Sequence, residues 1–348
     1  MKKNAFHGIA SAGSSALFPT LLFLLLASAS AAYAQNPPEP ARAPIRGQDI
    51  DASNTGVPPG RVLQKVGATI LVTEKWIASS NRGSRILQDK SFVSGAALIV
   101  AVDGFTVRYC KFFGKGGISL DPNDGRSPPG KNVSILDCEL DGNHENPGGK
   151  IAVFGSSLTL KRVHIHNWPR GMWVGDGDVW VEQCYMHDLT VDDSGAHLEN
   201  IYVGGGAHQV YLSNKLISNG VRIAGSGIMP ISASLAIYNE SFRKDPPFPG
   251  LADIRIEGNY FESDGYYPLY CGALDGKEGA FPTGMVVRGN VFGRQIQRYS
   301  GMGAPAVAFD SSRPGNVWEG NTWGAPGPSS KAGDPSEKAP IAAPLPMK

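Results

Sequence analysis

The chain has little cysteine, no excess of charge of either sign and no long hydrophobic run beyond its first 34 residues. Four cysteines in 348 residues are too few for a disulfide scaffold, and none forms a Cys-x-x-Cys metal-binding pair. Lys and Arg number 32 against 31 Asp and Glu, which excludes nucleic acid or an anionic membrane as a partner held by bulk charge. No segment has the 3.6-residue period of an amphipathic helix, and residues 204–206 (Gly-Gly-Gly) lack the helix and lysine of a nucleotide-binding loop.

The two ends of the chain differ from its middle. Lys2 and Lys3 precede an apolar run over residues 17–27 and a small-x-small site at residues 32–34, which predicts a bacterial signal peptide over residues 1–34. This run is shorter than the ~20 residues of a membrane-spanning helix, so we expect a secreted or periplasmic protein without a membrane span. Residues 35–60 are rich in Pro and predict a linker or N-terminal edge, and residues 325–348 predict a disordered tail.

A repeat of two short alternating strands runs through residues 61–324 and is clearest in residues 179–203. We align its copies on one position, which holds Cys110, Cys138, Val163, Cys184, Asn214, Asn259, Asn290 and Asn321. Two residues later the side chain is always large and apolar, and copies recur at intervals of 21 to 45 residues. Constant strands with variable intervals predict a parallel β-helix with loops of varying length. The copy at Asn214 is out of register by one residue, which predicts a β-bulge.

The aligned position itself is predicted to face the core. Four successive asparagines there predict a ladder in which stacked amides bond to each other along the coil. The cysteines at this position are expected to act as small apolar side chains, although the spacing of Cys110 and Cys138 also permits a disulfide between neighbouring coils.

Several segments resemble those of a known superfamily. They are residues 53–58 (SNTGVP), 185–189 (YMHDL), 204–206 (GGG), 290–294 (NVFGR) and 318–323 (WEGNTW), with the segment around His197. With these segments the chain resembles the right-handed parallel β-helix proteins of the pectate-lyase-like superfamily, and within it secreted bacterial β-helix repeat proteins. The resemblance covers most of residues 53–324 and implies a single, all-β, right-handed parallel β-helix. It is less specific for activity, because this fold carries lyases, hydrolases, epimerases and binding proteins.

One motif departs from those relatives. Where they often have His-x-Asp-Gly-Ile/Val-Gln, this chain has His197-Leu-Glu199-Asn-Ile-Tyr202. The histidine is kept, the carboxylate is longer by one methylene, and the glutamine is replaced by Tyr202. The departure leaves open whether substrate contacts or activity differ.

The second strand of each copy is predicted to present one side chain outward, in the series Ser119, Ala152, Trp173, Tyr202, Ala236, Tyr270 and Ala308. Trp173, Tyr202 and Tyr270 would form an exposed aromatic strip, suited to stacking on sugar rings, unless a loop such as residues 243–250 covers it. Lys150 lies beside this strip, and we expect these four side chains to bind substrate.

Three further residues beside the strip suit the cleavage of an acidic polysaccharide by β-elimination. That reaction needs a base and a cation that neutralises the uronate carboxylate. Arg170 would supply the cation, and His197 or Glu199 the base. The sequence therefore predicts a secreted, carbohydrate-active, monomeric protein of polysaccharide-lyase type. The alternative is a non-catalytic glycan-binding or surface-structural β-helix protein.

Two smaller groups of polar residues remain open. Asp188, Asp192 and Asp193 could bind Ca²⁺, which takes several oxygen ligands, or could belong to an ordinary solvated loop. His166 and His187 occupy one place in successive copies and predict a stack of rings at a turn, which we favour over a catalytic role.

Overall fold

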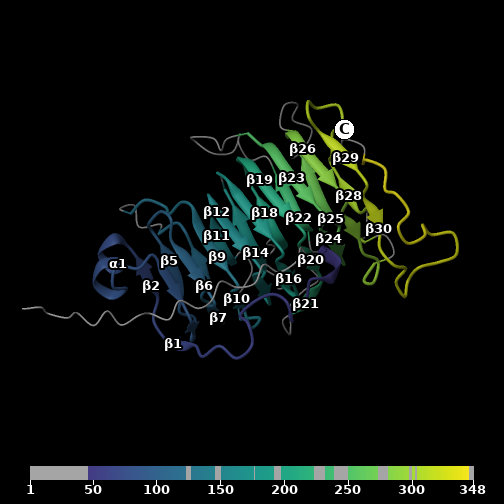
Figure 1. The fold of residues 1–348 in the computed structure, drawn as a ribbon. Coiled ribbons are helices and arrows are strands. Elements are labelled where there is room, and N and C mark those ends of the chain that lie inside the picture. Colours follow the sequence, from purple (N-terminus) through teal and green to yellow (C-terminus); the bar gives the residue numbers. More distant parts are fainter. Residues whose placement is uncertain are drawn as a thin grey trace, which may run out of the picture. The chain divides into compact units, whose positions relative to one another are not determined.

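The computed structural model describes residues 46–122, 127–145, 150–175, 177–191, 197–222, 232–238, 250–272, 281–297, 300–301 and 304–344. The chain divides into two units, Met1–Ala43 and Pro44–Lys348. The first unit, and with it the predicted signal peptide, lies outside the described residues, as do residues 35–45 of the predicted linker. The second unit is a parallel β-helix, as predicted (Figure 1).

Three parallel sheets form the sides of the coil, and the chain visits them in the repeated order C, A, B. Sheet A contains, in spatial order, β1 (Gln64–Val66), β4 (Lys90–Phe92), β7 (Lys111–Phe113), β10 (Glu139–Asp141), β13 (His164–His166), β16 (Tyr185–His187), β20 (Lys215–Ser218), β24 (Tyr260–Ser263), β27 (Val291–Phe292) and β30 (Thr322–Trp323). Sheet B contains β2 (Ile70–Val72), β5 (Leu98–Val100), β8 (Ile118–Ser119), β11 (Ile151–Gly155), β14 (Arg170–Val174), β18 (Glu199–Val203), β22 (Ala233–Tyr238), β25 (Tyr267–Gly272) and β28 (Ala306–Val307).

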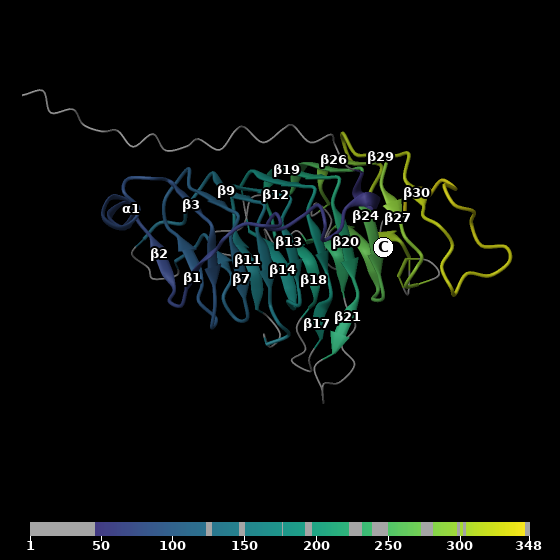
Figure 2. The ribbon, with the colours of Figure 1, turned by 60° about the horizontal axis from the view of Figure 1, so that its bottom comes forward.

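Sheet C contains β3 (Ile86–Gln88), β6 (Thr106–Arg108), β9 (Val133–Leu136), β12 (Leu158–Lys161), β15 (Val179–Glu182), β19 (Ala207–Leu212), β23 (Ala252–Glu257), β26 (Thr283–Arg288) and β29 (Val317–Glu319). A small fourth sheet pairs β17 (Leu189–Val191) with β21 (Gly220–Arg222) beside the coil (Figure 2). Helix α1 (Glu74–Ser80) and the 3₁₀ turn η1 (Gly47–Asp49) complete the described elements. No helix in these described ranges is long and apolar enough to cross a membrane.

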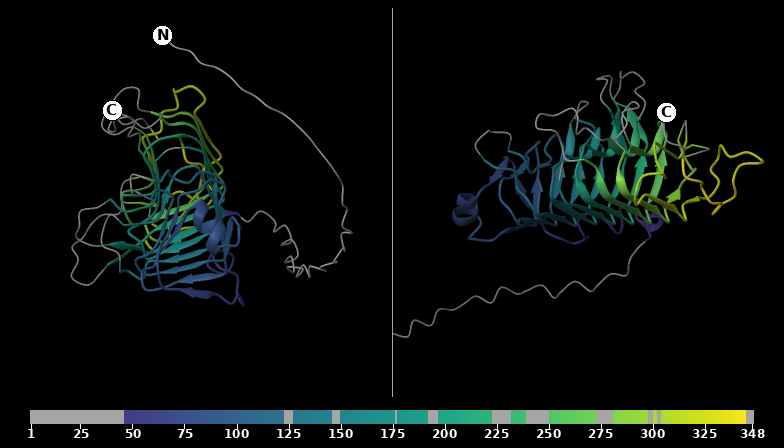
Figure 3. Two further views of the ribbon diagram at one scale, coloured as in Figure 1. Left: turned by 90° about the vertical axis from the view of Figure 1, so that its left-hand side faces the viewer. Right: turned by 90° about the horizontal axis from the view of Figure 1, so that it is seen from above.

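From β6 to β30, the corner between sheets C and A has one construction. A single residue with positive φ, between 50° and 64°, turns the chain, and the aligned core residue follows it. The turning residues are Tyr109, Asp137, Arg162, Gln183, Ser213, Gly258, Gly289 and Gly320. Because this corner never changes length, the connections that vary in length lie before or after sheet B. Figure 3 shows the strands stacked side by side along the coil.

The predicted asparagine ladder is confirmed. The side-chain nitrogen of Asn214 donates to the Oδ1 atom of Asn259 at 3.0 Å, and the same bond links Asn259 to Asn290 and Asn290 to Asn321. Each Oδ1 also accepts the backbone N–H of the preceding aligned residue, which is Cys184 for Asn214 and an asparagine for the others. Each amide also donates to a carbonyl oxygen of the preceding coil. The ladder satisfies buried polar groups that would otherwise destabilise the core.

The strand register predicted from the sequence was wrong in two places, one in sheet C and one in sheet B. There is no bulge before Asn214, because Tyr211 pairs with Val181 on one side and Ile256 on the other and fills the inward position. A tyrosine fits there because its hydroxyl donates to the buried Gln209 at 2.8 Å.

In sheet B the outward series contains Phe154 in place of Ala152, and Val307 in place of Ala308. Phe154 pairs with Ser119 and Trp173, and Val307 pairs with Tyr270. The alternation of apolar residues fits either register in these two strands, so sequence alone chose the wrong one.

The cysteines are free and buried, including Cys110 and Cys138, so the disulfide left open by the sequence does not form. The backbone N–H of Cys110 lies 3.4 Å from the sulfur of Cys138. Burial raises the pKa of the Cys184 thiol to about 12. The four free thiols are therefore apolar side chains of the core.

Both ends of the described chain fold onto the coil. Residues 338–341, which we expected to be disordered, return to β30 and β29, where Ile341 donates to Asn321 and accepts from the indole of Trp318. Ala339 and Ile341 pack against the core, so this segment covers its C-terminal end. At the other end, the indole of Trp76 in α1 packs edge-on against Phe105 at 6.4 Å.

A segment before the first strand runs back along the corner of sheets C and A. We call residues 46–60 the strap. Gly47 donates to the carbonyl of Gly258, and Gly56 donates to the carbonyl of Arg162. A Cβ at Gly47 would lie 2.6 Å from the Asn214 carbonyl oxygen, which explains the glycine. The part of the predicted linker that is described is thus an ordered cover.

Asn259→Ala tests the ladder. The substitution removes one donor and one acceptor and leaves the Tyr211 carbonyl and the Asn214 N–H buried without them. We expect the free energy of unfolding to fall by about 3 kcal/mol, measured from the denaturant midpoint. Lys65→Ala, on an exposed position of β1, is the control and should change it by less than about 0.5 kcal/mol. An equal loss in both variants would contradict the role of the ladder.

Candidate functional site

The outer face of sheet B is the best candidate for a functional surface. The connections that flank this sheet differ in length from coil to coil, whereas the corner between sheets C and A is constant. Variable loops placed on a rigid scaffold are where binding and catalytic groups usually lie. Of the residues that the sequence predicted as catalytic, Arg170 and Glu199 begin neighbouring strands of this sheet, and His197 lies two residues before Glu199.

Arg170, His197 and Glu199 come together, although 29 residues separate the arginine from the glutamate. Arg170 and Glu199 begin β14 and β18 and pair directly across the sheet. The Arg170 Nε atom donates to Glu199 Oε2 at 2.9 Å, and Nη2 donates to the carbonyl oxygen of His197 at 3.0 Å. The ion pair is buried, because the Glu199 side chain has no exposed surface and that of Arg170 is 10 % exposed.

The ring of His197 faces solvent beside this pair. Its side chain is 68 % exposed, and its Nδ1 atom lies 3.8 Å from Glu199 Oε1. The hydroxyl of Ser232, which precedes β22, lies 3.2 Å from the same nitrogen. Of the three predicted catalytic residues, His197 alone has a side chain exposed enough to contact a substrate. Arg170 and Glu199 are buried beside it, and Arg170 donates to its carbonyl oxygen.

The predicted aromatic strip exists, but its tyrosines are buried. Tyr202 is 9 % exposed and Tyr270 is 7 % exposed, so the expectation of an exposed strip is wrong for both. Tyr238, which the sequence analysis missed, lies between them, with ring centres 5.3 and 4.7 Å away. It stands two residues beyond Ala236 on the same strand, and that spacing was the available signal.

Trp173 is the more accessible aromatic side chain of the strip. It is half-buried and packs edge-on against Tyr202 at 5.4 Å and against Phe154 at 5.5 Å. The guanidinium carbon of Arg170 lies 4.9 Å from the centre of the Tyr202 ring and 5.5 Å from that of Trp173. The aromatic rings of Trp173 and Tyr202 therefore hold the arginine by cation–π contact and also pack against each other.

The remaining predicted site residues divide between this face and elsewhere. Lys150 is exposed and precedes Ile151, the partner of Arg170 in the neighbouring coil. Asp188 instead turns the chain between sheets, where it accepts hydrogen bonds from His187 at 2.8 Å and from Asn219. The hydrogen bond from His187, followed by that from Asn219, holds the pKa of Asp188 at about 2 despite partial burial. Asp192 and Asp193 lie outside the described residues, so the calcium hypothesis keeps no described ligand but an already bonded Asp188.

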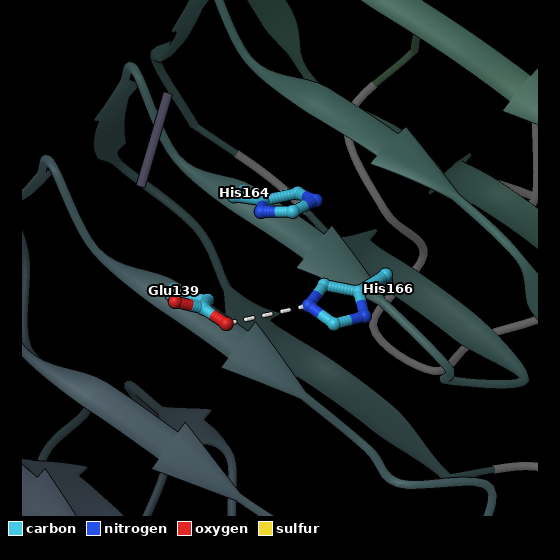
Figure 4. A group of neighbouring side chains, drawn as sticks. All are labelled: Glu139, His164 and His166. Carbon is cyan, nitrogen blue, oxygen red and sulfur yellow. Dashed lines mark ion pairs between the residues drawn. The ribbon is translucent and has the colours of Figure 1, made fainter. Parts of the chain in front are cut away.

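A second cluster of polar side chains lies on the outer face of sheet A (Figure 4). The predicted stack of His166 on His187 is confirmed, with ring centres 5.4 Å apart and an angle of 6° between the rings. His164 stacks on both of them, and Glu139 lies in the neighbouring coil, 3.5 Å from the Nε2 atom of His166. Within the described ranges, Glu139, His164 and His166 are the side chains placed to hold a metal ion.

The charges in this second cluster are set by its burial. Desolvation, then the neighbouring histidines, lowers the pKa of His164 to about 3, so its ring is neutral at pH 7. Burial by itself would raise the pKa of Glu139, but the contacts with His166 and Lys111 outweigh it and lower the pKa to about 2. The cluster therefore contains an ionised carboxylate beside a neutral imidazole.

Comparison with known proteins adds little to this geometry. No protein-family model matches the chain, and no curated protein matches it. Among solved structures, a mannuronic acid specific polysaccharide family 6 lyase from the human gut microbiota is similar over 75 % of this chain and 78 % of its own. The identity is 11 % and the TM-score is 0.25, and a likeness at that level carries no argument about activity.

The Arg170–Glu199 pair gives a test of the site's construction. Arg170→Met leaves a buried carboxylate without its counter-ion, so we expect the free energy of unfolding to fall by about 3–5 kcal/mol. The double variant Arg170→Met/Glu199→Met removes both charges and should recover most of this loss. Thermal or denaturant unfolding of the three proteins measures the difference. A double variant as unstable as the single one would contradict a buried, mutually compensating pair.

Proposed function

We propose that the protein binds an acidic, uronate-containing polysaccharide on the outer face of sheet B and cleaves it by β-elimination. The observation that carries the proposal is the convergence of His197 with Arg170 and Glu199 beside Trp173. An exposed base next to positive charge and a partly exposed aromatic ring is the set of groups that this reaction needs.

His197 is the base in this proposal. Its exposed ring takes the proton from the carbon next to the uronate carboxylate, and the electron pair left behind forms the carbon–carbon double bond as the bond to the leaving sugar oxygen breaks. The protonated ring then returns its proton to that oxygen. Glu199 is a positioning residue: its carboxylate lies 3.8 Å from Nδ1 of His197 and binds Arg170, which in turn donates to the backbone carbonyl of His197.

The two basic residues near the strip have different roles in this proposal. Glu199 offsets the charge of Arg170, whose remaining task is to fix the backbone of His197 and to pack against Tyr202 and Trp173. Lys150 is exposed in the preceding coil and supplies the charge that faces the uronate. This division changes the sequence prediction, in which Arg170 alone neutralised the carboxylate.

A non-catalytic glycan-binding protein is the second candidate. The buried Arg170–Glu199 pair favours it, because a locked pair and packed tyrosines give a rigid platform without a free cation at its centre. In that case Trp173 and Lys150 would hold the sugar, and His197 would be an ordinary polar contact.

An activity assay with matched histidine variants tests the proposal. His197→Ala is compared with His208→Ala, since His208 on sheet C is also 68 % exposed and lies near a carboxylate, that of Asp253. Purified protein is mixed with a panel of uronate polysaccharides, and absorbance of unsaturated uronic acid is followed. We expect the wild type and His208→Ala to produce it, and His197→Ala to lose at least about 100-fold in kcat.

The other outcomes of this assay are equally decisive. No absorbance and no new reducing ends, together with retention on one glycan, would replace the lyase by the binding protein. Equal activity of the two histidine variants would remove His197 from the reaction. Neither activity nor retention on any glycan in the panel would contradict both candidates.

A further inference from the structure

The cluster on sheet A has no part in the proposed reaction, and its geometry fits a metal ion. The candidate ligand atoms of Glu139, His164 and His166 all lie within 4.8 Å of one another. Glu139 Oε1 and His166 Nε2 are 3.5 Å apart, too long for a good hydrogen bond. Two ligands on a tetrahedral Zn²⁺ with bonds of about 2.0–2.1 Å lie about 3.4 Å from each other. This pair already has nearly that separation.

A chain of hydrogen bonds orients the His164 ring. The Nδ1 atom of His187 lies 2.8 Å from the Asp188 carboxylate, and its Nε2 atom lies 2.8 Å from His164 Nε2. Because His187 engages the Nε2 atom of His164, Nδ1 is the nitrogen of His164 that is left to bind a metal ion. This arrangement of carboxylate, histidine and histidine is how proteins orient a metal-binding imidazole.

His166 would bind the same metal ion through its Nε2 atom. Its Nε2 atom is buried and has no hydrogen-bond partner in the described structure, and it points toward Glu139 (Figure 4). Its Nδ1 atom accepts a hydrogen bond from the side-chain nitrogen of Asn167 at 2.9 Å and lies 3.7 Å from Asp141 Oδ1. When Nε2 binds a metal, the ring proton moves to Nδ1, and the Asn167 amide turns its nitrogen away so that Nδ1 can donate to the Asp141 carboxylate.

We propose that Glu139 through its carboxylate, His164 through Nδ1 and His166 through Nε2 bind one divalent transition-metal ion of the Zn²⁺ type. Two imidazoles and one carboxylate suit Zn²⁺, Co²⁺, Ni²⁺ or Cu²⁺ better than Ca²⁺ or Mg²⁺, which prefer oxygen ligands. Three protein ligands leave a fourth tetrahedral position for water or another small ligand.

The strap and Lys111 frame this site. A Cβ at Gly56 would lie 3.1 Å from the His164 Cβ and 3.8 Å from its Nδ1, so the strap passes closely over the ligands. The ammonium group of Lys111 lies 2.8 Å from Glu139 Oε1, the same oxygen that faces His166. Lys111 therefore competes with the metal. Its side chain is 38 % exposed, which lets the ammonium group turn into solvent when the ion binds.

Metal titration of the full chain, made without a histidine tag and stripped with a chelator, tests the proposal. We expect one equivalent of Co²⁺ to bind per chain with the visible absorption of a tetrahedral site, and Zn²⁺ to displace it. His166→Gln and Glu139→Gln should each weaken Zn²⁺ binding at least about 100-fold in competition with a chromophoric chelator. His187→Gln, which acts through His164, should weaken it about 10-fold or more.

Two further variants complete the test. Lys111→Met removes the competitor and should tighten Zn²⁺ binding, whereas His208→Gln should leave it unchanged because His208 is exposed on sheet C. Circular dichroism of each metal-free variant establishes that it has folded. The proposal is overturned if the wild type binds no stoichiometric Co²⁺ or Zn²⁺, if His166→Gln binds as tightly as His208→Gln, or if Lys111→Met binds no more tightly than the wild type.

Discussion

The corner between sheets C and A is the constraint on which the rest of this molecule depends. One residue with positive φ turns the chain in coil after coil, and the next residue points into the core. Where that residue is asparagine, its amide bonds to the coils on both sides and fixes their spacing and register. Because this corner is invariant, neighbouring coils keep one register, and side chains from distant parts of the sequence form rows on the outer faces.

Those rows explain why two chemically different faces arise from a single repeat. On sheet B one row pairs Arg170 with Glu199, and the next places Trp173 beside Tyr202. On sheet A the same register stacks His166 on His187 and sets Glu139 beside His164. Each of these pairs brings together residues that are 21 to 29 positions apart in the sequence, which no local motif would reveal.

Much of the fold was readable from the sequence, because the core position repeats in a chemically narrow way. The asparagine ladder and the histidine stack followed from alignment alone, and both are confirmed. The same alignment did not recognise Tyr211 as an inward residue, because a tyrosine is usually expected to face outward. Its hydroxyl is satisfied in the core by the buried Gln209, which the sequence did not reveal. Phe154 was missed because two registers of β11 fit the apolar alternation equally well.

The candidate site was only partly predictable, for a different reason. Sequence spacing placed Arg170, His197 and Glu199 on adjacent coils correctly, but it could not give their burial. Tyr202 is buried, and Arg170 pairs with a fully buried Glu199. Both facts depend on contacts between neighbouring coils, which cannot be read from the residues adjacent in the sequence. Arg170 is buried, whereas His197 and Lys150 are exposed and can contact a substrate. Their proposed roles therefore differ from those that the sequence predicted.

Hydrogen–deuterium exchange with and without an acidic oligosaccharide tests most directly whether the outer face of sheet B is the working surface. We expect the oligosaccharide to slow exchange in β14, in β18 and at Lys150, which directly precedes β11. Exchange in β13 and β16 of sheet A should stay unchanged. Slower exchange confined to sheet A, or none anywhere with an oligosaccharide that the protein retains, would contradict it.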